Sequence, residues 1–373
     1  MSKPKIRFNG FTEDWEQRKL GDVVEFLDTQ RKPLEGAKRV HGPYPYYGAS
    51  GIVDYVDGYL FDEELVLLSE DGANITDRNY PVCFLAAGKY WVNNHAHVLK
   101  MRDGNENYFI CNSLERKDYT KYNTGMAMPK LNQETCRNIP VMCPKLAEQK
   151  KIGDYFRHLD HLITLHQRKC KQTKKIKKFM LQKMFPQNGK AVPEIRFEGF
   201  TEDWEQRKVK ELCLISTGKS NTQDKVDDGA YPFYVRSPIV ERSNKYLYDE
   251  EAVLTVGDGV GTGKVFHYVN GKYDLHQRCY RMYGFSDKLN SKYFYHTFSL
   301  LFCKRVMAMT AKTSVDSVRL DMIADMEIPI PQIDEQIKIG ACFDHLDHLI
   351  TLHQRKCDEL QNMKKFMLQN MFV

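Results

Sequence analysis

Residues 156–185 read FRHLDHLITLHQRKCKQTKKIKKFMLQKMF, and residues 343–372 read FDHLDHLITLHQRKCDELQNMKKFMLQNMF. The two stretches agree at 22 of 30 positions, at an offset of 187 residues. In both, a stripe of mainly apolar residues advances by alternating steps of three and four, which is the spacing of a helix in a coiled coil. The sequence therefore predicts two long, nearly identical helices. Their stripes are expected at Leu159, Leu162, His166, Lys169, Thr173, Ile176 and Met180, and at Leu346, Leu349, His353, Lys356, Leu360, Met363 and Met367.

The repeat extends outward from the helices. Residues 6–19, IRFNGFTEDWEQRK, match residues 195–208 at 13 of 14 positions. Residues 44–67 match residues 231–254 more weakly, at 13 of 24 positions. A solenoid needs at least three short repeats, so two long ones indicate an internal pseudo-twofold arrangement instead.

The segments between the helices are rich in Tyr, Phe and Val, with short Gly, Pro, Asn and Asp turns, as in small domains built mostly of strands. We therefore predict an α+β protein in which two mixed α/β domains are separated by two long antiparallel helices, a coiled-coil spacer. The expected boundaries are a first domain at 1–143, a first helix at 144–186, a second domain at 187–330 and a second helix at 331–373.

Composition limits the class of protein. The chain has 373 residues, of which 42% are hydrophobic and 28% charged, close to the average for globular proteins. No run reaches the roughly 18 apolar residues of a membrane span, and MSKPKIRF has no apolar signal core, so a cytoplasmic protein is expected. The ten scattered cysteines contain no C-x-x-C pair, which favours free thiols over a zinc ribbon.

The motifs that catalysis would need are missing. GDGVGTGK (257–264) resembles a phosphate loop, but Val265 stands where a Walker motif requires Ser or Thr. An adenine methyltransferase would need an N-P-P-F/Y or D-P-P-Y tetrapeptide, which is absent. The stripe residues His166 and His353 are expected to be polar breaks in a helix seam rather than metal ligands. We therefore predict a binding protein with no catalytic residue and no metal.

Charge is mildly basic and unevenly distributed. Lys and Arg number 55 against 49 Asp and Glu, an excess of six. Residues 166–183 contain eight Lys or Arg and no acid, whereas the equivalent 353–370 contains four bases and two acids. This lysine-rich face could be merely solvated, or it could lie along a phosphate backbone or an acidic partner.

Several blocks together resemble the specificity (S) subunit of type I restriction-modification enzymes. These are the domain–helix–domain–helix plan, the IP…EQ…I start of each helix, LDHLITLHQRK, and YYGASGIVDYV with EDGAN and NNHAHVL. The resemblance covers nearly the whole chain. It implies that each domain is a target recognition domain that reads one half of a bipartite, asymmetric site on double-stranded DNA. It also implies that each helix is a conserved spacer.

The same resemblance implies a set of partners. One S subunit would hold two methyltransferase (M) subunits, and restriction (R) subunits would complete a nuclease. The chain itself would then need no cofactor, since S-adenosylmethionine, ATP and Mg would serve the partner subunits. Adenine methylation and cleavage would be directed by this chain but performed by those partners, and no membrane is involved.

The site residues are expected where the two domains differ, because unlike half-sites require unlike side chains with donors and acceptors. The candidates in the first domain are Tyr47, Ser50, Asn74, Asn93, Asn94, His95, His97 and Lys130. Those in the second are Arg236, Ser237, Lys264, His276, Gln277, Arg278, Lys312 and Thr313. The M-subunit or helix interface is expected at Leu159, Leu162, Ile176, Met180, Leu346, Leu349, Met363 and Met367.

For any single candidate, a structural or phosphate-positioning role is as reasonable as a base contact, because half or more of protein–DNA hydrogen bonds go to phosphate and sugar. Two alternatives to the S subunit also stay open. One is a stand-alone DNA-binding or anti-restriction protein that uses the same two domains. The other is a fused nuclease or methylase, against which the missing catalytic motifs argue.

Overall fold

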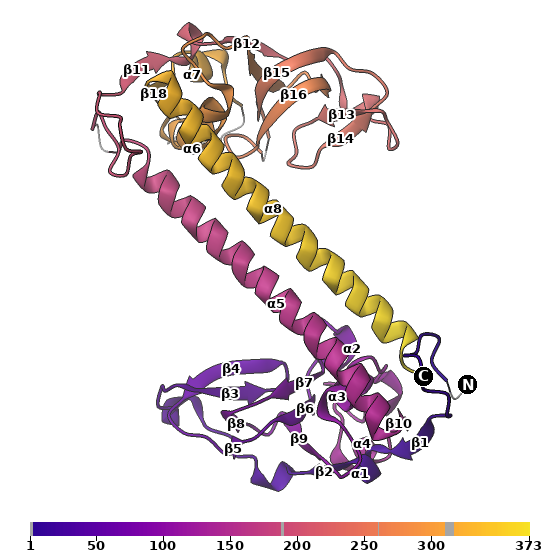
Figure 1. Ribbon diagram of the computed structural model, residues 1–373. Helices are drawn as coiled ribbons and strands as arrows, with labels where there is room; N and C mark the ends of the chain where they lie inside the picture. The colour runs from indigo at the N-terminus through magenta and orange to yellow at the C-terminus, as the bar shows by residue number, and fades with distance from the viewer. Residues whose placement is uncertain (1–2, 188–189, 260, 310–316) are drawn as a thin grey trace. The chain divides into compact units, whose positions relative to one another are not determined.

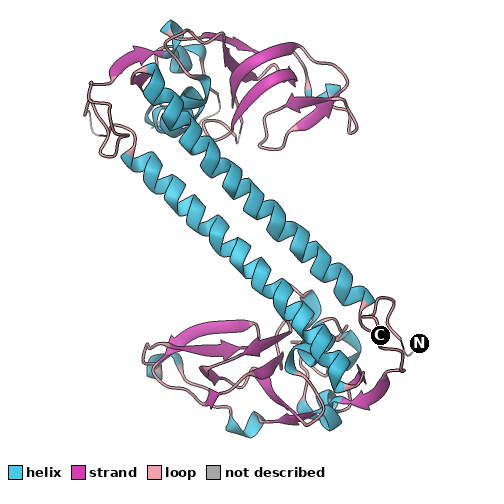
Figure 2. Cartoon of the chain, in the orientation of Figure 1, coloured by secondary structure: helices cyan, strands magenta, loops and turns pink. Residues whose placement is uncertain are grey.

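The computed structural model describes residues 3–187, 190–259, 261–309 and 317–373. The chain divides into two compact units. Unit 1 comprises Met1–Gln167 with Arg355–Val373, and unit 2 comprises Arg168–Gln354. Each unit holds one β-rich domain and part of both long helices, and Figure 2 shows the strands gathered in these domains.

Three sheets build the domain of unit 1. The first has the order β2 (Val24–Phe26), β9 (Ala96–Met101), β6 (Leu65–Ser69), β7 (Cys83–Ala86). The second has the order β4 (Gly51–Val56), β3 (Tyr44–Gly48), β8 (Lys89–Val92), β5 (Phe61–Asp62). The third pairs β1 (Glu16–Lys19) with β10 (Pro140–Cys143). The helices are α1 (Leu20–Val23), α2 (Asn74–Asp77), α3 (Asn107–Glu115) and α4 (Gln133–Arg137).

The continuous apolar run of β6 is explained by two cores. Val66 and Leu68 join the core under α3, whereas Leu65 and Leu67 join a second core with Tyr90 on the opposite face. Successive side chains of a strand point to opposite faces, so a strand buried on both faces reads LVLL without alternation.

Unit 2 repeats this topology with longer strands. A six-stranded sheet has the order β12 (Leu214–Thr217), β17 (Cys279–Tyr283), β15 (Tyr248–Val256), β16 (Phe266–Leu275), β13 (Tyr231–Tyr234), β14 (Glu241–Ser243). A separate pair joins β11 (Glu205–Lys208) to β18 (Glu327–Ile330). The helices of this domain are α6 (Ser291–Met309) and α7 (Leu320–Ala324). Unit 1 has the two short strands β5 and β6 where unit 2 has the long strand β15. It likewise has β7 and β8 where unit 2 has the long strand β16.

The two long helices are α5 (Leu146–Lys183) and α8 (Ile333–Asn370), each of 38 residues (Figure 1). They run antiparallel within each unit. In unit 1, Lys364 Nζ lies 2.6 Å from an Asp160 carboxylate oxygen. In unit 2, the equivalent Lys177 Nζ lies 2.6 Å from Asp347. None of the helices in the described ranges combines the length and low polarity needed to cross a membrane.

The helix stripe differs from the predicted one at every second position. Ile163 and Cys170 are buried, whereas Lys169 and Ile176 are exposed. Both stripes advance by three and four, and they share 159, 166, 173 and 180, so the spacing could not choose between them. Packing decides which stripe is buried, because Ile163 belongs to the core of unit 1. The observed stripe runs through Ile152, Phe156, Leu159, Ile163, His166, Cys170, Thr173, Met180 and Met184 in α5, and through Ile339, Phe343, Leu346, Ile350, His353, Cys357, Leu360, Met367 and Met371 in α8.

The start of the chain lies beside the end of α8. The Ile6 N–H donates to the Asn370 carbonyl at 2.9 Å, and both termini appear together in Figure 1. The repeat places Ile195 in the same way at the end of α5, where its N–H donates to the Lys183 carbonyl at 2.9 Å. Segment 6–19 therefore lies against the end of α8, in the way that segment 195–208 lies against the end of α5. Segment 195–208 comes after α5 in the sequence, whereas segment 6–19 is far from α8 in the sequence.

Candidate nucleic-acid interface

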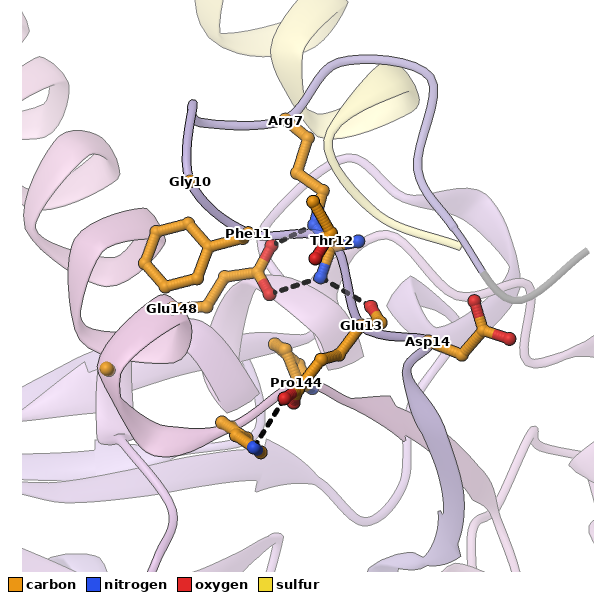
Figure 3. Close-up of a pocket in the computed structure, with 10 residues that line it drawn as sticks. Arg7, Gly10, Phe11, Thr12, Glu13, Asp14, Pro144 and Glu148 are labelled. Carbon is orange, nitrogen blue, oxygen red and sulfur yellow. Dashed lines mark hydrogen bonds and ion pairs between the residues drawn. The ribbon is translucent and has the colours of Figure 1, made fainter.

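A buried ion pair fixes each domain to its helix. The Arg7 guanidinium donates from Nε and a terminal nitrogen to the two Glu148 carboxylate oxygens at 2.7 and 2.8 Å, beside a cavity of about 170 Å³ (Figure 3). In unit 2, Arg196 contacts Glu335 at the same two distances. Both glutamates lie in the first turn of a long helix, where the helix dipole favours an acid.

The following glutamine forms a second link. Gln149 Oε1 accepts the N–H of Glu106, the N-cap residue of α3, and Gln149 Nε2 donates to the Pro144 carbonyl. Gln336 repeats this with the Asn290 N–H and the Pro331 carbonyl. The E-Q dipeptide at the start of each helix therefore orients the β-rich domain, which explains its retention in both halves.

In unit 1, loops from three strands meet at one edge. The parallel strands β3 and β8 end side by side, with Tyr47 opposite Val92, so the loops after them share an edge. The Asp71–Gly72 turn after β6 joins this edge, because Asp71 Oδ1 and Oδ2 both lie 2.9 Å from His95 Nδ1. Lys130 is brought to it by a backbone bridge with Asp71. The exposed side chains here are those of Ser50, Asn94, His95 and Lys130.

Unit 2 builds the same edge with other side chains. Strands β13 and β16 are parallel, with Tyr234 opposite Leu275. Asp258, the equivalent of Asp71, lies 3.2 Å from Arg236 and 3.8 Å from Arg278. The exposed candidates Arg236, Gln277 and Arg278 gather here, with Ser237 half-buried beside them.

Hydrogen bonding shows that the loop after β8 in unit 1 and the loop after β16 in unit 2 are equivalent. Asn93 Oδ1 accepts the His95 N–H at 2.8 Å, and His276 Nδ1 accepts the Arg278 N–H at 3.0 Å. Burial, and then the nearby Arg236, lower the pKa of His276, which keeps Nδ1 free to accept. His95 and Arg278 therefore occupy the same place in the two domains, as do Asn94 and Gln277.

Five other candidates have structural roles. Tyr47 stacks on Phe84, and the Asn74 amide spans the loop to Tyr80. Asn93 and His276 are 7% and 4% exposed, and they hold the loops just described. Asn74, Asn93 and His276 therefore have little surface left for a base, and Tyr47 is half-buried.

His97, the fifth, is 1% exposed and lies 2.6 Å from Asp28 Oδ2. Burial has the largest single effect and lowers the pKa of His97, but Asp28 and Cys136 together outweigh burial and raise this pKa to about 10. It is therefore a buried imidazolium in an ion pair, with no face toward the edge.

The remaining candidates divide by position. Lys264 is exposed in the turn between β15 and β16. Lys312 and Thr313 lie outside the described residues. Sequence reasoning missed Asp71 and Asp258 as the acids that hold the edge, although the Asp-Gly pair is retained in both halves and could have indicated them. In the part of the chain that the structure describes, no three His, Cys, Asp or Glu side chains are grouped to bind a metal ion.

The helix candidates fall into two groups. Leu159 is buried in the seam, and Leu162, Met180, Leu346, Leu349 and Met367 are half-buried. Ile176 is 52% exposed, and its repeat partner Met363 is 47% exposed. Two residues that the sequence analysis missed lie three positions further on, Phe179 at 50% and Phe366 at 55%. Each helix therefore shows an apolar pair that its own unit leaves about half exposed.

Two β-rich domains, each tied to a long helix by the same contacts and each carrying a differently equipped edge, define a two-site recognition protein. Residues 12–175 and 201–362 both match the type I restriction modification DNA specificity domain. The chain belongs to this family of type I restriction enzyme specificity subunits.

Individual relatives agree with the family. A type I restriction enzyme MjaVIII specificity subunit of Methanocaldococcus jannaschii is 23% identical over 393 residues, covering 95% of this chain and 91% of the relative. A specificity subunit of Haemophilus influenzae is 36% identical over 137 residues, which span 37% of this chain and 35% of that protein. The S subunit structure from M. genitalium has a TM-score of 0.81 at 13% identity, covering 100% of this chain and 99% of that one, and it shows the shared fold.

Replacing Arg278 by alanine tests the edge of unit 2. If Arg278 reads a base, the variant is expected to relax the preference at one position of one half-site by ~1–3 kcal/mol, the range of a good bidentate contact. Binding to duplexes with single base changes measures this. A uniform loss on every duplex, with a flatter salt dependence, would instead show a phosphate contact.

Proposed function

We propose that the chain sets the DNA sequence on which a type I methyltransferase and nuclease act, and that it is itself non-catalytic. Each domain reads one half of a bipartite, asymmetric site. The observation that carries this proposal is the pair of equivalent edges with unlike side chains. His95 against Arg278, and Asn94 against Gln277, offer different donors and acceptors from the same backbone.

The chemistry of these side chains suits base reading. Arginine pairs best with guanine, and asparagine or glutamine with adenine, through two hydrogen bonds in the major groove. Asp71 and Asp258 hold His95 and Arg278 from one side, which lowers the entropy lost when these side chains contact DNA. Different side chains in the two domains support unlike half-sites.

The helices supply the second part of the function, the docking of methyltransferase subunits. Ile176 with Phe179, and Met363 with Phe366, are half exposed at equivalent positions. Large apolar side chains repeated on a surface mark an interaction site, and two copies support two identical partners. A protein that worked alone would have no use for these pairs, which favours the subunit over the stand-alone alternative.

Changing Ile176 and Phe179 to serine tests this docking. The double variant is expected to retain one methyltransferase subunit where the wild type retains two, because the Met363 and Phe366 pair is untouched. Burying the exposed half of two such apolar side chains contributes about 1.5–3 kcal/mol, enough to weaken one site by about 10- to 100-fold. Co-purification after co-expression with the methyltransferase gives the stoichiometry.

The matched control is Lys171→Ser with Lys178→Ser, which shortens two exposed side chains of the same helix without removing apolar surface. Two retained subunits are expected there. If the wild type retains no methyltransferase at all, docking is refuted and the stand-alone alternative takes its place.

A further inference from the structure

Each domain carries a second exposed cluster, and this one is the same in both. In unit 1 the rings of Tyr44 and Tyr59 meet edge to face at 5.2 Å, and Lys89 Nζ lies 4.8 Å from the centre of the Tyr59 ring. Tyr59 is 43% exposed. We name these three residues the first Tyr–Tyr–Lys cluster.

Unit 2 contains an equivalent cluster with similar distances. Tyr231 and Tyr246 lie 4.8 Å apart, and Lys272 Nζ lies 4.6 Å from the centre of the Tyr246 ring. Tyr246 is 41% exposed. We name these three residues the second Tyr–Tyr–Lys cluster. Tyr231 begins β13 as Tyr44 begins β3, and Lys272 lies in the part of β16 that corresponds to β8.

The two lysines do not form the close ion pairs that neighbouring lysines form, although Asp62 and Asp249 lie opposite them on the paired strands. Lys100 lies 2.9 Å from Glu63, and Lys225 lies 3.0 Å from Glu241. In the described ranges, no carboxylate lies within 4.0 Å of Lys89 or Lys272. The phenol of Tyr59 raises the pKa of Lys89, and that of Tyr246 raises the pKa of Lys272, so both amines stay charged. Each cluster thus offers one unpaired ammonium and two phenol donors.

Identity between the domains separates this cluster from the reading edges. Side chains that read unlike half-sites must differ, whereas a contact with the phosphate backbone carries no sequence and can be the same in both. Phosphate is also the ligand that an unpaired lysine with neighbouring hydroxyl donors suits.

The position of the cluster fits a duplex that lies on the edge. Lys89 begins β8, and the edge loop follows the end of that strand. Four residues of strand span roughly 13 Å. That is close to the ~12 Å width of the major groove, so a domain that reads bases at the edge has a flanking backbone within reach of its cluster.

We propose that the first and second Tyr–Tyr–Lys clusters each bind one DNA phosphate, as sequence-independent contacts that set each domain on its half-site. This inference rests on the proposed function.

The test uses Lys89→Gln and Lys272→Gln, singly and together, in the full chain with the methyltransferase that co-purifies with it. The probes are a duplex carrying the motif methylated in cells and a duplex with one half scrambled. Each single variant is expected to flatten the slope of log affinity against log salt by about 1, and to weaken binding about tenfold near 0.1 M salt. The two variants should match each other on both duplexes, and the methylated motif should stay unchanged.

Two controls remove a similar charge from a paired lysine, Lys100→Gln and Lys225→Gln, and should leave the slope nearly unchanged. A slope unchanged in Lys89→Gln and Lys272→Gln would overturn the inference, as would a changed base preference. Loss of the methyltransferase without loss of DNA affinity would assign the clusters to a protein contact instead. A wild type with no preference for the motif would refute the proposed function itself, an outcome distinct from an unchanged slope.

Discussion

Replacing Glu335 by leucine is expected to lower the stability of unit 2 by about 3–5 kcal/mol, the usual cost of removing one partner of a buried ion pair. Glu335 is 0% exposed, and its two oxygens accept from Arg196 at 2.7 and 2.8 Å. Leucine keeps most of the volume but leaves a guanidinium largely out of water without a counter-charge. Hydrogen exchange of the α6 amides reports this loss within unit 2 alone.

A second substitution separates the ion pair from the packing. Arg196→Met together with Glu335→Leu replaces both charges by apolar groups, which is often neutral or stabilising. The double variant should therefore recover most of the lost stability. Asp334→Ala, an exposed neighbour, should change it by no more than about 0.5 kcal/mol. A single variant as stable as the wild type would contradict the anchoring role of Glu335.

The same pair exists in unit 1 between Arg7 and Glu148, so Glu148→Leu gives an internal replicate. Equal losses in the two units would show that the duplication preserves the energetics of the joint between domain and helix. The joint matters for function because a recognition domain that pivots on its helix cannot hold its edge on fixed bases.

The long helices and the duplicated plan could be predicted from the sequence because repetition and periodicity are properties of the sequence itself. The seam of the helices could not. Leu162 and Ile163 are adjacent and both apolar, and both fit an alternation of three and four. Only the core that receives Ile163 decides between them.

The edges were predicted in part. Divergence between the domains indicated His95 and Arg278, and the structure places both at equivalent points. Divergence also indicated His97 and His276, which the structure buries. A buried polar side chain that holds a loop differs between two domains as readily as a reading residue does, so sequence difference alone cannot separate the two roles.

Residues that are the same in both halves also indicate structural roles, which a comparison of the differing residues does not reveal. Glu148 and Gln149 are retained because they orient the domain, and Asp71 is retained because it holds the His95 side chain at the edge. The two Tyr–Tyr–Lys clusters fall in the same class. Their significance appears only when the fold shows that they are exposed.

The largest effect on specificity is expected from exchanging residues 20–137 with those of another S subunit. This stretch contains the whole edge of unit 1 but leaves both E-Q dipeptides and both helices unchanged. The donor domain should therefore dock on the same joint, and the recipient should keep its second edge. The predicted change is complete for one half of the target and absent for the other.

Methylome sequencing of cells that carry this exchanged subunit with its methyltransferase measures this directly. The account predicts a bipartite motif with one new half, one original half and an unspecified gap between them. A single continuous motif, or a change in both halves, would contradict the claim that each domain reads its own stretch of DNA.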